Sequence, residues 1–201
     1  HEQGFIPLEP RCVAVARCAD GVPHEVELRF GDVVAPPPGV VEGRRVAGRV
    51  LVVRLSAWVS GGRRAFDAAV DAAHDADMNF LLDYVANHVH EQHPIYVDHP
   101  DWATDLYLPD GSLNTERWDD HRLTTWFDTF LPTLDLEQPE VAAAMSDSAT
   151  WWVLNSEIDG FRHDATKHIP ETFWRMLTQK IKRSSNRPIF QIGETYGSPE
   201  L

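Results

Sequence analysis

The sequence has little cysteine and few basic residues. Only Cys12 and Cys18 occur among 201 residues, and two thiols at this spacing match neither a zinc motif nor a disulfide framework. Acidic residues outnumber basic ones by 31 to 18, for a net charge of -13. We therefore expect no nucleic-acid partner and no contact with an anionic membrane surface, since both require a basic face.

Long apolar runs are also missing. None approaches the roughly 18 residues that a bilayer span requires, and the amino terminus lacks the basic and then apolar pattern of a signal peptide. The chain begins at His1, so a leader could have been removed. The compartment therefore stays open, with a cytoplasmic location favoured, and no pattern indicates the oligomeric state.

Lysine is absent from residues 1–63, which hold eight Arg and seven acidic residues for a net charge of +1. Residues 64–201 carry a net charge of -14, so the composition changes near Gly61. The runs 26–30 and 50–55 before this boundary are typical of strands. We interpret 1–63 as a divergent segment, either a small β-rich piece before the main domain or sequence that does not pack with it.

Helices and strands alternate from residue 64 onward. Apolar residues at helical spacing occur within 66–73, 138–157 and 171–183, and these runs lead into apolar strands at 79–85, 158–163 and 188–194. This alternation favours a parallel α/β sheet or barrel with right-handed crossovers.

Polar side chains follow each of the three strands. They are Asp83 with Asn87 and His88, then Arg162 with Asp164, and finally Glu194. The ends of parallel strands lie on one rim of a barrel, so we expect these side chains to converge. Asp164 and Glu194 come from adjacent strands, an arrangement suited to the acid and nucleophile that cleave an acetal. The alternative is that each is an ordinary paired or solvated strand-end residue.

Three segments carry a family resemblance. Residues 83–88 read DYVANH, residues 160–168 read GFRHDATKH, and residues 193–195 read GET. In order and spacing they resemble the first three signature regions of the α-amylase family of glycoside hydrolases, and LPTLD at 131–135 is similar to its short fifth region. The resemblance covers about 64–201. It implies a (β/α)8 TIM barrel, here truncated after the fifth strand, with a domain B-like insertion at 89–137 after the third strand.

The resemblance implies a glycosidase that cleaves α-glucosidic bonds of α-glucans or malto-oligosaccharides with retention of configuration. Asp164 matches the nucleophile, which would form a covalent glucosyl intermediate, and Glu194 matches the general acid. The carboxyl groups of retaining enzymes lie about 5 to 5.5 Å apart. Arg162 would keep Asp164 ionised and oriented through a charge-assisted hydrogen bond.

The same resemblance assigns the substrate contacts. Asp83 and His88 would bind hydroxyls of the sugar at the cleavage site, while Lys167 and His168 would reach the sugar on the leaving-group side. Aromatic residues of the insertion are expected to stack on sugar or to form a satellite core beneath the loop. They are Tyr96, Trp102, Tyr107, Trp118, Trp126, Phe127 and Phe130.

The chemistry requires no cofactor, but many family members bind a structural calcium ion. Here its ligands would be Asn87 and the main-chain carbonyl of His168. A partner acid would come from the insertion, with Asp98, Asp101 and Asp105 as candidates.

Three alternatives stay open. The first is a transglycosylase of the same family, which shares every residue named above. The second is a metal-dependent barrel hydrolase built on His88, His90 and His93. The third is a catalytically silent relative that binds sugars or partners. The family's third acid, an Asp preceded by His at the seventh strand, does not occur before Leu201. We therefore expect residues 1–201 alone to be inactive.

Overall fold

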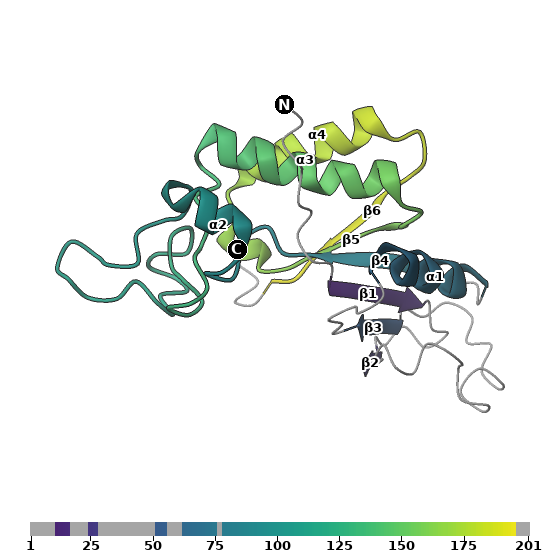
Figure 1. Cartoon of the computed structure of the whole chain (residues 1–201), viewed down its shortest axis with the longest axis horizontal. Coiled ribbons are helices and arrows are strands. Elements are labelled where there is room, and N and C mark those ends of the chain that lie inside the picture. The colour runs from purple at the N-terminus through teal and green to yellow at the C-terminus, as the bar shows by residue number, and fades with distance from the viewer. Residues whose placement is uncertain (1–10, 17–23, 28–50, 56–61, 76–77, 196–201) are drawn as a thin grey trace.

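The computed structural model describes residues 11–16, 24–27, 51–55, 62–75 and 78–195. Six strands form one sheet in the order β2-β3-β1-β4-β5-β6 (Figure 1). The strands are β1 (Arg11–Ala16), β2 (His24–Glu27), β3 (Leu51–Leu55), β4 (Asn79–Tyr84), β5 (Gly160–His163) and β6 (Phe190–Gly193). The helices are α1 (Gly62–Asp75), α2 (Pro94–Asp98), α3 (Pro139–Asn155) and α4 (Glu171–Ser184), with 3-10 turns η1 (Pro100–Trp102) and η2 (Thr166–His168).

β4, β5 and β6 are parallel neighbours and form the part of the sheet that leads to the predicted site. In their register Asp83 stands opposite Arg162, and Arg162 stands opposite Ile192. Each of these three strands lies within the range predicted for it. Because the three strands run in one direction, their carboxyl ends meet at one edge of the sheet. The prediction that Asp164 and Glu194 follow adjacent strands is confirmed.

The amino-terminal strands join the same sheet with a different polarity. β1 is antiparallel to both β4 and β3, while β2 and β3 are parallel to each other. The sequence predicted strands at 26–30 and 50–55, which overlap β2 and β3, but it did not predict β1. A barrel of the expected type would place a parallel strand beside β4. The antiparallel β1 therefore departs from that pattern, and Gly61 and the residues 28–50 between β2 and β3 lie outside the described part of the chain.

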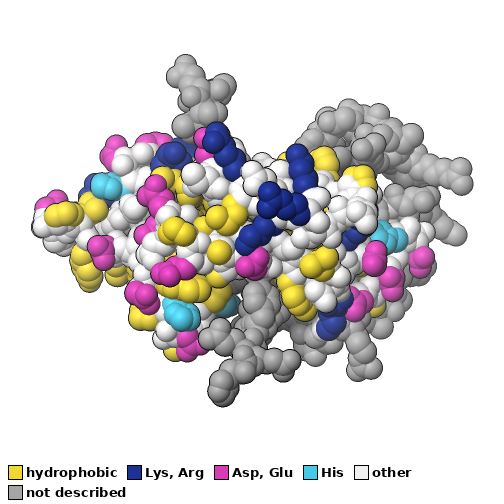
Figure 2. Space-filling model, turned by 90° about the horizontal axis from the view of Figure 1, so that it is seen from above, with side chains coloured by type: hydrophobic (Ala, Val, Ile, Leu, Met, Phe, Trp, Pro, Cys, Tyr) yellow, Lys and Arg dark blue, Asp and Glu magenta, His cyan; other side chains and the backbone are white. Residues whose placement is uncertain are grey.

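Among the described helices, α1, α3 and α4 pack apolar side chains inward. The predicted faces are confirmed as buried, with Phe66, Ala69, Val70 and Ala73 on α1 and Val141, Met145, Ala149 and Trp152 on α3. On α4, Phe173, Leu177 and Ile181 are buried. α3 and α4 lie side by side over the sheet (Figure 1). Basic side chains are spread across the face of the molecule seen from above (Figure 2). Within the described residues, no helix combines the length and apolarity needed to cross a bilayer.

The β5 and β6 backbones approach closely at Gly160. A Cβ atom there would lie 2.0 Å from the carbonyl oxygen of Phe190, so only glycine fits. β6 pairs with β5, and none of the other described strands pairs with its outer edge. Phe190 and Ile192 are 54% and 47% exposed along this strand. β6 thus carries apolar side chains on an open edge of the described sheet.

The insertion at 89–137 forms the long loops to one side of the sheet in Figure 1. Apart from α2 and η1 it is held by isolated bridges, such as His88 with Thr133 and Thr115 with Trp126. Trp126 and Leu134 are buried, whereas Tyr107 and Phe130 are exposed. The aromatic residues therefore divide between a small satellite core and the surface.

Candidate functional site

Arg162 forms the centre of the candidate site. Its Nη1 donates hydrogen bonds to Asp83 Oδ1 and Asp164 Oδ1, each at 2.7 Å, and its Nη2 pairs with Glu194 Oε2. The Arg162 side chain is only 12% exposed. The carboxyl ends of β4, β5 and β6 thus bring three carboxylates onto one partly buried cation.

The surroundings of Asp164 favour its ionised form. Burial alone would raise the pKa of Asp164, but the hydrogen bond and the positive charge of Arg162 outweigh it and lower the pKa below its ordinary value. The charge of His88 and a hydrogen bond from Glu194 act in the same direction. Asp164 is therefore a carboxylate at neutral pH, as a nucleophile must be.

One guanidinium holds the carboxyl groups of both Asp164 and Glu194, the first through Nη1 and the second through Nη2. The two acids therefore meet at the same cation, and Glu194 contributes to the lowered pKa of Asp164. The separation of roughly 5 to 5.5 Å expected for a retaining pair stays a prediction.

Main-chain hydrogen bonds continue beyond the strand ends and fix both acids. Asp164 N donates to Tyr84 O at 3.2 Å, and Glu194 N donates to His163 O at 2.8 Å. Thr166 N returns to Glu194 O at 3.0 Å. Between them the chain turns sharply at Ala165, which has a left-handed conformation with φ of 50°. This turn directs the chain away from the sheet directly after Asp164.

Asp83 lies behind Arg162 in this arrangement. Its side chain is 2% exposed, and its carboxylate accepts a hydrogen bond from the guanidinium. The contact that the structure shows for Asp83 is therefore with Arg162. The expected binding of sugar hydroxyls by Asp83 stays a prediction.

His88 lies beside the acids at the start of the insertion. Its ring stacks on Phe127 with centroids 4.6 Å apart and an interplanar angle of 26°. Its main chain pairs with Thr133. The charge of His88 contributes to the lowered pKa of Asp164. The expected contact of His88 with sugar hydroxyls stays a prediction.

Lys167 and His168 occupy the η2 turn that follows Asp164. Lys167 Nζ pairs with Asp119, and His168 Nδ1 donates to the carbonyl of Arg122 at 2.8 Å. Burial lowers the pKa of His168, although the Arg122 carbonyl opposes this effect. Both residues lie between the sheet and the insertion. Asp119 and Arg122 are site neighbours that the sequence did not reveal, because neither belongs to a motif and both are more than 40 positions away.

Asn87 offers one ligand that suits a cation. The side chain is fully buried, and its Oδ1 accepts no hydrogen bond within the described residues. A buried amide oxygen without a donor is unfavourable unless another group satisfies it. Amide oxygens are among the ligands that calcium prefers, so the residue present fits the ion that the sequence suggested.

The three histidines proposed as a metal site have separate environments. His88 stacks on Phe127, His90 Nδ1 accepts from the main chain of Gln92, and His93 Nδ1 accepts from Ile95 N at the start of α2. In the described part of the chain, no group of three His, Cys, Asp or Glu side chains is placed to hold a metal. The geometry therefore gives the metal-hydrolase alternative no support.

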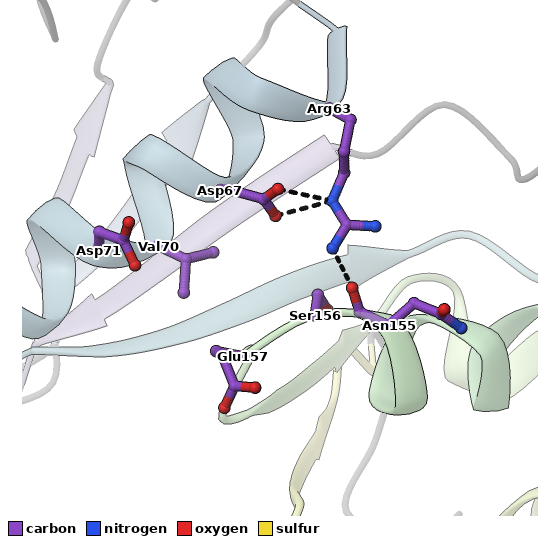
Figure 3. A pocket seen from close by; sticks show the side chains of 7 residues that line it. All are labelled: Arg63, Asp67, Val70, Asp71, Asn155, Ser156 and Glu157. Carbon is purple, nitrogen blue, oxygen red and sulfur yellow. Dashed lines mark hydrogen bonds and ion pairs between the residues drawn. The ribbon is translucent and has the colours of Figure 1, made fainter.

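A separate cavity of about 200 Å³ lies between α1 and the end of α3 (Figure 3). Its lining comprises Arg63, Asp67, Val70, Asp71, Asn155, Ser156 and Glu157. Arg63 Nε pairs with Asp67 at 2.7 Å and its guanidinium also reaches Asn155 O. These residues belong to α1 and to the segment before β5, so the cavity is distinct from the acids that follow the strands.

Known proteins resemble most of the described chain. The family model for the alpha amylase catalytic domain matches residues 60–197. A cyclomaltodextrinase from a Bacillus species is 27% identical over 149 residues, which cover 68% of this chain and 25% of the relative. An intracellular maltogenic amylase from Bacillus subtilis is also 27% identical, over 70% of this chain and 24% of its own length. The chain thus spans about a quarter of these curated relatives.

Solved structures give the same result for the fold. An alpha-amylase from Geobacillus thermoleovorans, in complex with acarbose, is 32% identical with a TM-score of 0.56. The match covers 67% of this chain and 29% of that one. The parallel strands β4, β5 and β6 and their helices therefore have the fold of part of a TIM barrel.

Proposed function

We propose a function on one established premise: this chain belongs to the alpha-amylase family. The proposal is that Asp164 and Glu194 are the two carboxyl groups that cleave an α-glucosidic bond in α-glucans or malto-oligosaccharides, with retention of configuration. The observation that supports it is that both acids, at the ends of adjacent strands, contact the guanidinium of Arg162. The named relatives act on substrates of this class, as their names state.

In the first step the Asp164 carboxylate attacks the anomeric carbon. A bond forms between carbon and carboxylate oxygen while the glycosidic carbon–oxygen bond breaks. Glu194 gives its proton to the departing oxygen, so a hydroxyl leaves. Arg162 contributes by keeping Asp164 ionised and oriented before attack.

In the second step Glu194 takes a proton from water. The resulting hydroxide attacks the same carbon from the face that the leaving group left, and the bond to Asp164 breaks. The product keeps the configuration of the substrate because the carbon inverts twice. Transfer to a sugar hydroxyl in place of water follows the same path, so a transglycosylase uses the same two acids.

Some of the remaining residues would contact the sugar directly, and one would act through Arg162. His88, stacked on Phe127 beside Asp164, would contact hydroxyls of the sugar at the cleavage site. Lys167 and His168 would contact the sugar on the leaving-group side. Asp83 acts behind Arg162 and holds its guanidinium in place.

Calcium is a structural ion in this proposal. Asn87 Oδ1 and the carbonyl of His168 would hold it, and an acid of the insertion would complete the charge. The ion would supply no step of the reaction; it would fix the insertion against the strand ends. Chelator is expected to lower the melting temperature, and Asn87→Ala should remove that sensitivity. An unchanged chelator effect in this variant would reject Asn87 as a ligand.

Trapping the covalent intermediate tests the proposed chemistry. A fluorinated α-glucosyl fluoride should label Asp164, identified by peptide mass spectrometry, and Asp164→Asn should abolish labelling. Glu194→Gln should still be labelled, because fluoride leaves without a proton. The same variant should turn over unactivated malto-oligosaccharides about 10³-fold more slowly than the wild type. The assay uses the protein as its gene encodes it. Labelling at another residue, or none, would refute the assignment.

A further inference from the structure

The η2 turn has two different anchors. Its first residue is tied to the sheet, because Thr166 N donates to Glu194 O at 3.0 Å and Thr166 Oγ1 donates to His163 O at 3.1 Å. Lys167 and His168, at the other end, make their side-chain contacts with the insertion instead. The position of these two residues therefore depends on a segment more than 40 positions earlier in the chain.

Arg122 forms hydrogen bonds with both Lys167 and His168. Its Nη1 donates to the carbonyl of Lys167 at 2.7 Å, and its own carbonyl accepts from His168 Nδ1 at 2.8 Å. Arg122 thus holds the main chain of Lys167 and the ring of His168. Since Nδ1 must be the donor to a carbonyl, Nε2 of neutral His168 carries a lone pair and can accept a hydroxyl hydrogen.

Side chains near Arg122 complete the contact. Asp119 pairs with the ammonium of Lys167, whose side chain is 11% exposed. The rings of Trp118 and Phe127 pack against His168 with centroids 5.6 Å and 5.2 Å away. The Trp118–Phe127 segment is itself braced, since Thr125 N donates to the carbonyl of His121 at 2.8 Å.

We propose that Arg122 is the positioning residue that fixes Lys167 and His168 for the sugar on the leaving-group side. This proposal rests on the function proposed above. Arg122 lies outside the carboxylate cluster and acts through the two residues that it holds. Its loss should therefore weaken the use of long substrates more than the chemistry at Asp164.

Arg117 provides a matched control. It lies in the same segment, and the contacts of its guanidinium are to Leu113 O and Ser112 Oγ, both within the insertion. Arg117→Ala removes the same charge and side chain as Arg122→Ala without touching η2. A difference between the two variants therefore measures the contact of the Arg122 guanidinium with the carbonyl of Lys167, because both variants keep the main-chain carbonyl that holds His168.

The kinetic test compares two substrates in the protein as its gene encodes it. α-Glucosyl fluoride has no sugar on the leaving-group side, whereas maltotetraose has at least one. For Arg122→Ala, the ratio of kcat/KM for maltotetraose to that for the fluoride should fall about tenfold, mainly through KM, as for loss of a charge-assisted hydrogen bond. Arg122→Lys should recover part of the ratio, and Arg117→Ala should keep it. An equal loss with both substrates, or none, would overturn the proposal.

A labelling experiment tests the same contact without catalysis. An amine-reactive reagent should modify Lys167 slowly in the wild type. In Arg122→Ala the rate should rise about fivefold, because one charge-assisted hydrogen bond to Lys167 is lost. Exposed Lys182 serves as the internal reference. Arg117→Ala should leave the Lys167 rate unchanged. Failure to cleave α-glucosides would reject the proposed function but not this result, whereas equal Lys167 rates in all three proteins would reject the role of Arg122.

Discussion

His163 is expected to make the fold sensitive to acid. The ring is 4% exposed and packs among Tyr84, Phe161 and Trp174. Its Nε2 lies 3.1 Å from Gln191 Oε1, while its buried Nδ1 has no hydrogen-bond partner within the described residues. Burial lowers the pKa of His163 from 6.5 to about 4, so the folded protein takes up this proton only in strong acid.

The sign and size of the effect follow from this pKa. The unfolded chain binds the proton near pH 6.5 and the folded chain only near pH 4, so acid favours unfolding between these values. The contribution of His163 to stability is complete above pH 6.5 and is lost as the pH falls. The loss reaches about 2 kcal/mol at pH 5 and about 3 kcal/mol below pH 4.

Urea denaturation at pH 7 and pH 5 measures this loss. His163→Gln keeps a donor for Gln191 but does not titrate, so its free energy of unfolding should fall by about 2 kcal/mol less than that of the wild type. His90→Gln, at an exposed histidine, is the matched control and should follow the wild type. If His163→Gln loses as much stability as the wild type between the two pH values, His163 is not the acid-sensitive group.

Further substitutions test the packing of the site. Arg162→Met should lower the free energy of unfolding in urea by about 3 to 5 kcal/mol, because it leaves buried carboxylates without their cation. Arg175→Met removes an exposed ion pair and should change that free energy by less than about 1 kcal/mol. Similar losses in the two variants would contradict the buried network. Gly193→Ala places a Cβ 2.7 Å from Thr166 Oγ1 and should cost about 1 to 3 kcal/mol, which Thr166→Ala should partly restore in a double-mutant cycle. Gly160→Ala meets backbone instead, so no second substitution should rescue its thermal melt, and a soluble, normally melting variant would disprove the close approach.

Periodicity predicted the elements that bury one face. The helical spacing of Val141, Met145 and Ala149 indicated a face that is indeed buried in α3. The strand β1 was missed because its six residues, RCVAVA, form a short and almost continuous apolar run, which periodicity alone does not assign to a strand or a helix. Its antiparallel pairing with β4 depends on long-range contacts that no local pattern contains.

The sequence predicted the site residues that lie at the ends of strands. Asp164 and Glu194 were brought together by the rule that parallel strands end at one edge. The hydrogen bond of Asp83 with Arg162 was not predicted, because it depends on how the two strands pair and pack. Nor could Arg122 be found, since its contact with η2 is set by the course of an irregular loop.

The open edge of β6 also bears on handling the protein. Among the described strands none pairs with the outer edge of β6, where Phe190 and Ile192 are exposed. An unpaired edge of this kind can template the addition of a strand from another molecule. Preparations in which nothing covers this edge should therefore associate as concentration rises, and a lysine at position 192 would oppose that association through charge repulsion.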